Sequence, residues 1–145
     1  MPERETIERA REDAREGKSP STQAGEFVRE EIHHVREGKH GARSPRQAIA
    51  IGLSKARRAG IKLKPPKGSA SVRKKAKQDT KAGRRRNRRK STGRSRSTSA
   101  ALRRESRGTT GKKAISRQAQ RAAAKRGHGA RSAAARRAAQ TRKAA

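Results

Sequence analysis

The chain has 145 residues, of which 43 are Lys or Arg and 12 are Asp or Glu, so its formal net charge is +31 at pH 7. This charge lies almost entirely in one half. Residues 1–60 carry 13 basic and 10 acidic residues, whereas residues 61–145 carry 30 basic residues and only two acids, Asp79 and Glu105. A polycation of this density predicts a polyanionic partner, and nucleic acid is the natural candidate.

Composition also excludes several classes of protein. There is no cysteine, which rules out disulfides and thiolate metal sites. The longest apolar stretch, residues 48–53, is far too short to span a membrane, and the acids Glu3, Glu5 and Glu8 stand where a signal peptide would be apolar. We therefore expect a cytoplasmic protein associated with the nucleoid, or a nuclear one if the source is eukaryotic, with no membrane partner.

Residues 1–64 are predicted to form an α-helical mini-domain with helices over about 2–16, 20–37 and 45–59. Ser19 and Ser44 each precede a proline, which is typical of a helix N-cap followed by the first helical position. Apolar residues then recur at three- and four-residue spacing along the second and third helices. Gly60 ends the third helix, and Ile61 follows it where a Schellman motif would place a contact back onto Ala56.

The remaining residues, 65–145, are expected to be a long basic tail of low complexity. Beyond Pro66 the only large apolar residues are Val72, Leu102 and Ile115, too few to offset a backbone ordering entropy of about 1–2 kcal/mol per residue. Segments 114–126 and 130–145 are rich in Ala, Arg, Lys and Gln and could become helical once phosphates neutralise them. The predicted fold is thus all-α, a small helical N-terminal unit followed by a tail that is disordered or conditionally helical.

Nucleic-acid contacts are assigned to the tail. Lys and Arg dispersed among Ala, Gly and Ser suit phosphate contacts that carry no sequence information. The single aromatic residue, Phe27, belongs to the predicted core, so no platform exists for stacking unpaired bases, and duplex DNA is favoured over RNA. The candidate residues are Arg73, Lys74, Lys75, Lys77, Arg84, Arg85, Arg86, Arg88, Arg89, Lys90, Arg94, Arg96, Lys112, Lys113, Arg136 and Arg137.

The sequence does not predict a catalytic site or a metal site. His33 and His34 are adjacent, hence on diverging sides of a helix, and lack the four-residue spacing of a metal pair, while Glu37 is the only obvious acid nearby. Glycine-rich phosphate cradles and nucleophile elbows are absent. We expect no catalytic residue, no metal site, no cofactor and no enzymatic activity.

Three stretches resemble a family of small, highly basic bacterial proteins with no established activity. They read SPSTQAGEFV at residues 19–28, GKHGARS at 38–44 and QAIAIGLSKAR at 47–57. The resemblance covers roughly the first 65 residues, implies a bacterial source, and brings no catalytic or ligand residues with it. The tail is also similar in composition to the Lys/Arg/Ala-rich tails of linker histones.

These observations predict non-specific DNA binding through phosphate neutralisation, as a nucleoid-associated or DNA-compacting protein. The helical unit would supply a homodimer contact or a second DNA contact. Two alternatives stay open: an RNA-binding or ribosome-associated protein, and an adaptor whose helical hairpin binds a protein partner.

Overall fold

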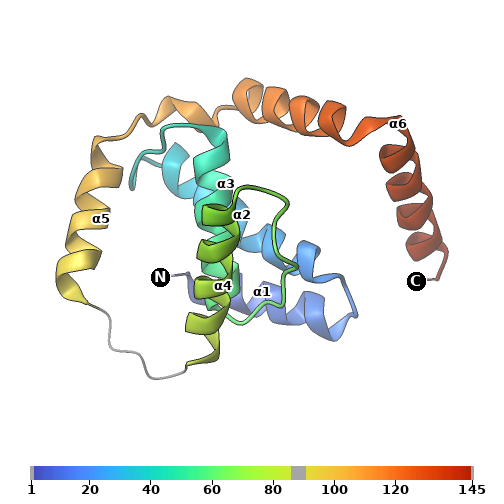
Figure 1. Ribbon diagram of the computed structural model, residues 1–145, viewed down its shortest axis with the longest axis horizontal. Coiled ribbons are helices and arrows are strands. Elements are labelled where there is room, and N and C mark those ends of the chain that lie inside the picture. The colour runs from blue at the N-terminus through green and yellow to red at the C-terminus, as the bar shows by residue number, and fades with distance from the viewer. Residues whose placement is uncertain (1, 86–90, 145) are drawn as a thin grey trace. The chain divides into compact units, whose positions relative to one another are not determined.

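The computed structural model describes residues 2–85 and 91–144, and these residues form helices without any strand (Figure 1). The α-helices are α1 (Arg4–Arg15), α2 (Pro20–Arg36), α3 (Pro45–Arg58), α4 (Ala70–Arg84), α5 (Thr92–Arg104) and α6 (Lys112–Ala144), with a 3-10 turn η1 at Gly108–Thr110. The chain divides into two compact units, Met1–Thr110 and Gly111–Ala145. In the described ranges, no helix is long and apolar enough to cross a membrane.

Local signals set where α2 and α3 begin. The Oγ atoms of Ser19 and Ser44 accept hydrogen bonds from the backbone N–H groups of Thr22 and Gln47, at 3.3 and 3.2 Å. A proline at the next position supplies a φ that already suits the helix and lacks the N–H that would go unpaired there.

The end of α3 is closed by the expected Schellman motif. Gly60 adopts a left-handed φ of 101°, and its N–H donates to the carbonyl of Arg57 at 3.1 Å. The N–H of Ile61 donates to the carbonyl of Ala56, also at 3.1 Å, which confirms the motif.

Helices α1, α2 and α3 pack around two small apolar clusters. The first contains Ala10, Ala24, Phe27 and Ala56, with Ile7, Leu53, Ile61 and Leu63 packed against it; the second contains Val35, Ala42 and Ala48. Most of these side chains are small, so the helices approach closely. At Gly52, an added Cβ would lie 2.7 Å from the Cα of Val28 and 2.9 Å from the carbonyl oxygen of Phe27.

The prediction of a disordered or conditionally helical tail is wrong. Helices α4, α5 and α6 occupy most of the described residues after 64, and α6 alone has 33 residues. Each like-charged pair at i,i+4 costs only about 0.2–0.5 kcal/mol, and helix propagation over so many strong helix formers offsets that repulsion. Within α6, Gly127 has φ 72° and ψ 167°, so the backbone kinks there.

Helix α4 needs no core of its own because it packs on α3. Ser69 caps it by accepting from the N–H of Val72 at 3.4 Å, and Ala76 and Asp79 are buried on its inner side. The first compact unit therefore runs past residue 64, the boundary predicted from the sequence, and ends at Thr110.

The last turn of α5 and the segment after it are tied to the loop that precedes α3. Backbone N–H groups of Gly41 and Ala42 donate to the carbonyls of Leu102 and Ser106 at 2.8 and 2.9 Å. The hydroxyl of Thr109 donates to the carbonyl of Ala42 at 2.6 Å. These long-range bonds hold residues 102–110 in the first unit.

Candidate functional site

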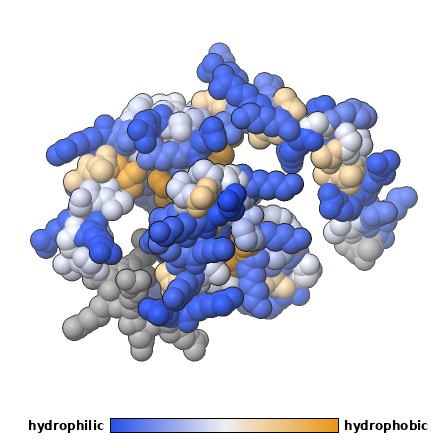
Figure 2. All heavy atoms as spheres, in the orientation of Figure 1, coloured by the Kyte–Doolittle hydropathy of each residue, from blue (hydrophilic) through white to orange (hydrophobic). Residues whose placement is uncertain are grey.

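The outer side of α4 is a continuous cationic face. Helical periodicity puts residues three, four and seven apart on the same side of the helix, and four cations follow that spacing. We call this set the α4 cationic face: Arg73, Lys74, Lys77 and Lys81, all exposed. Blue, hydrophilic side chains predominate over the region of this helix in Figure 2, below a paler patch at its upper end.

The one acid of α4, Asp79, points away from this face and is 2% exposed. Its carboxylate accepts from Ser54 Oγ at 2.7 Å, Arg58 Nε at 2.8 Å and Lys75 Nζ at 2.8 Å. Burial by itself raises the pKa of the Asp79 carboxyl, but the three donors outweigh burial and hold that pKa below its ordinary value. The acid is thus neutralised locally and subtracts little from the charge that α4 presents to solvent.

The other predicted contact residues fall into three groups. Arg94 and Arg96 lie on α5, and Lys112, Lys113, Arg136 and Arg137 lie on α6. Arg84 and Arg85 lie at the end of α4, and all the predicted residues that the structure describes are exposed. Arg86, Arg88, Arg89 and Lys90 lie outside the described residues. Among the described candidates, Lys75 differs because its ammonium is engaged by Asp79.

Chemically, the α4 cationic face can hold phosphates but cannot read bases. Its side chains are point charges and guanidinium forks without any neighbouring aromatic ring, because Phe27, the chain's one aromatic residue, is fully buried. Phosphate contacts made by such side chains give affinity that depends on salt and not on sequence.

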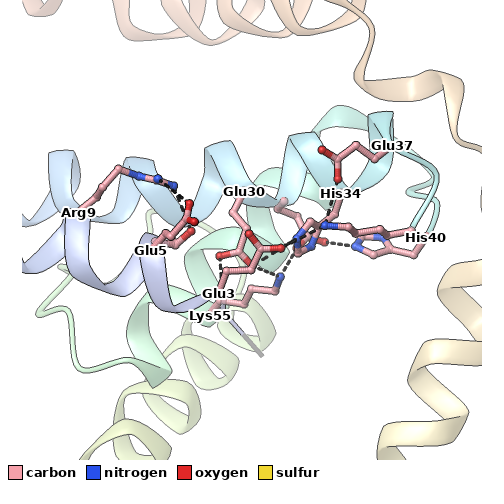
Figure 3. A network of polar contacts seen from close by, with 11 residues as sticks. Glu3, Glu5, Arg9, Glu30, His34, Glu37, His40 and Lys55 are labelled. Carbon is pink, nitrogen blue, oxygen red and sulfur yellow. Dashed lines mark hydrogen bonds and ion pairs between the residues drawn. The ribbon is translucent and has the colours of Figure 1, made fainter.

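A second polar constellation lies where α1, α2 and α3 meet. We call it the acid–histidine cluster: Glu3, Glu30, Glu31, His34, His40 and Lys55. Figure 3 shows Glu3, Glu30, His34 and Lys55 converging, with His40 beside His34. Lys55 Nζ lies 3.1 Å from Glu30 Oε1 and 2.7 Å from Glu31 Oε2, and the Glu30 and Glu31 side chains are 2% and 0% exposed.

The periphery of the cluster is more open. His34 Nε2 lies 2.9 Å from Glu3 Oε1, and Lys39 Nζ lies 3.1 Å from the same oxygen. Hydrogen bonding to His34, and then to Lys39, holds the pKa of the Glu3 carboxyl below its ordinary value. Glu3 therefore stays ionised, and it is the member of the cluster that comes from the start of α1.

This cluster was not predicted from the sequence, because the histidines lack the four-residue spacing of a metal-binding pair. Glu31 and His34 are three residues apart on α2, which also places two side chains on one helix face. His40 returns to them through the left-handed turn at Gly38, whose φ is 75°. The three-residue Glu–His spacing followed by a glycine turn was the available signal.

Comparison with known proteins gives one partial match. A model of a family of unknown function, DUF6496, matches residues 15–68, which is less than half of the chain. The matched region contains α2, α3 and most of the acid–histidine cluster, and it overlaps the three stretches on which the resemblance above rests. No curated protein and no solved structure matches the chain.

Proposed function

We propose that the protein binds duplex nucleic acid, DNA in preference to RNA, through phosphate contacts without sequence preference. In a bacterial cell it would act as a nucleoid-associated or DNA-compacting protein. The observation that supports this most strongly is the α4 cationic face, an exposed row of four cations on a helix whose only acid is buried and ion-paired.

The arrangement favours binding for two reasons. Closely spaced cations of one sign raise the local positive potential, so phosphates that approach the face release condensed counterions and gain free energy. The helix is also packed on α3 before any ligand arrives, so less backbone entropy is lost on binding than in a disordered tail.

The test is a salt titration of binding to a random-sequence DNA duplex. If about ten phosphates are contacted, log affinity plotted against log salt should have a slope of about −9. In the variant R73Q/K74Q/K77Q the slope should become shallower by up to about 2.7, because each phosphate that is no longer neutralised reduces its magnitude by about 0.9. Glutamine is a comparably good helix former, so α4 should stay helical.

A matched control removes the same charge from another helix. The variant R4Q/R11Q/R15Q neutralises three exposed arginines of α1, which stand among the acids of that helix, and should leave the slope unchanged. A salt-independent affinity in the wild type, or equal effects of the two triple variants, would contradict the proposal. Preference for structured RNA over duplex DNA at fixed salt would replace the DNA assignment with the RNA-binding alternative.

A further inference from the structure

The acid–histidine cluster is short of positive charge at its buried end. Glu30 and Glu31 are adjacent carboxylates with almost no exposure, and both contact the single ammonium of Lys55. Buried carboxylates are costly unless they are paired and hydrogen-bonded. Neither oxygen of Glu31 has a partner in hydrogen-bond geometry within the part of the chain that the structure describes, although both are fully buried.

The orientation of His40 places a further acceptor beside the buried carboxylate of Glu31, which already lacks positive charge. Its Nδ1 lies 3.0 Å from the carbonyl oxygen of Gly41, and because a carbonyl only accepts, Nδ1 must carry the hydrogen. In the neutral ring, the lone pair of Nε2 then faces Glu31 Oε1 at 3.2 Å. Two acceptors at that distance need a cation between them, either a proton on Nε2 or a metal ion.

The other groups favour a metal ion. Ligand atoms of Glu31, His34 and His40 all lie within 4.8 Å of one another. Two donors on a tetrahedral Zn²⁺ sit about 3.3 Å apart, given Zn–N distances of about 2.0–2.1 Å, so modest side-chain rotations would complete the site. A backbone carbonyl that fixes the far nitrogen of a histidine is also the usual outer support of a metal-bound imidazole.

We propose that Glu31, His34 and His40 bind a divalent transition-metal ion of the Zn²⁺ type. Imidazole and carboxylate ligands suit borderline metals of this kind. Glu31 would coordinate through Oε1 while Oε2 keeps its contact with Lys55, and His34 would turn from Glu3 toward the ion. The ion would join the last turns of α2 to the loop that leads into α3.

The histidines of this chain provide matched controls. His33 is the exposed neighbour of His34 on α2, and His128 lies in the second compact unit. The full-length protein, freed of nucleic acid, would be titrated with Zn²⁺ by calorimetry and with Co²⁺ by visible absorption. We expect one ion per chain, affinity reduced by about tenfold or more in H34Q and H40Q, and wild-type affinity in H33Q and H128Q.

A second measurement separates the removal of a ligand from a failure to fold. Circular dichroism and urea unfolding without metal should show H34Q and H40Q folded. Zn²⁺ should raise the urea midpoint of the wild type and of the control variants H33Q and H128Q, but not that of H34Q or H40Q. Absence of wild-type binding, with His40 doubly protonated by NMR, would show that a proton fills the gap and would overturn the proposal. Undiminished binding in H34Q or H40Q would overturn it equally. None of these residues lies on α4, so this result is independent of the nucleic-acid proposal.

Discussion

Asp79 shows how one residue controls the charge that a helix presents. It is one of two acids after residue 60, and its side chain reaches inward to Ser54 and Arg58, which belong to α3. The same contacts anchor α4 to α3 and remove a negative charge from the solvent side. Stability and surface potential thus depend on one carboxylate.

Replacing Asp79 by Asn should therefore lower the free energy of unfolding at pH 7 by about 1–3 kcal/mol, because Arg58 and Lys75 lose their counter-charge. The folded-state pKa lies below the ordinary value of about 3.9, so this stabilisation is present above about pH 4 and is lost as pH falls through the folded pKa. Urea unfolding should give a large difference from wild type at pH 7, and this difference should shrink as the pH falls below about 4 and through the lowered folded-state pKa.

The exposed carboxylate Glu8 offers a control for that experiment. The variant E8Q removes the same charge from the surface of α1 and should change stability by less than about 0.5 kcal/mol. If D79N unfolded at the same urea concentration as E8Q at pH 7, the anchoring role of Asp79 would be refuted.

At the scale of the elements, the crossing of α2 and α3 depends on the absence of a side chain at residue 52. The two helices contact through small residues, and Gly52 lies against the backbone of Val28. Gly25, on α2, has no atom within 4 Å of the place where its Cβ would be. One chain thus contains two helical glycines with opposite surroundings.

The variants G52A and G25A should accordingly change stability in opposite directions. G52A should destabilise by about 1–3 kcal/mol, because backbone atoms of α2 cannot give way without separating the helices. G25A should stabilise by about 0.5–1 kcal/mol, since alanine is the better helix former. Urea unfolding of both variants measures this, and a stabilised G52A would mean that the crossing is looser than described.

The same elements show what could be foreseen from sequence. The starts of α2 and α3 follow from capping signals within a few residues. The N-cap role of Ser44 was predicted from the sequence, and the structure shows its hydrogen bond. The packing of α4 could not be foreseen, because Ser54 and Arg58 lie 25 and 21 residues before Asp79. From sequence alone, that acid looks like an ordinary solvated charge.

The candidate site also has one part that could be predicted from the sequence and one part that could not. Exposure of the basic residues follows from composition, since lysines and arginines are rarely buried without partners. The acid–histidine cluster depends on the direction that the chain takes after the left-handed turn at Gly38. It also depends on the packing of α3 against α2, which brings Lys55 next to Glu31. Residue spacing along a single helix does not contain that information.

At the scale of the whole molecule, the apolar clusters belong to the first compact unit, whereas the second unit carries eleven Lys and Arg and no acid. About a third of the net charge, +11 of +31, therefore lies outside the unit that holds the apolar clusters. Removing the second unit should take away that charge and leave the first unit folded.

Truncation after Thr110 tests this separation. The shortened protein should keep the urea midpoint of the first unit, because its apolar clusters are intact. Its DNA affinity should fall and the salt slope should become shallower by about 0.9 for each phosphate that α6 contacts. An unchanged slope would show that the second unit does not take part in binding, and the disappearance of the unfolding transition would show that it supports the first.

The kink at Gly127 has a mechanical consequence. At about 1.5 Å per residue, the stretch from Lys112 to Arg126 is about 22 Å long, shorter than the roughly 34 Å of one DNA turn. A straight rod touches a cylinder along a short tangent and then diverges from it, so a single unbroken helix of 33 residues would carry its far charges away from the duplex. Under the proposed function, two shorter rods joined at a glycine can each lie along their own tangent, so α6 would follow the curvature of a duplex better than one straight helix.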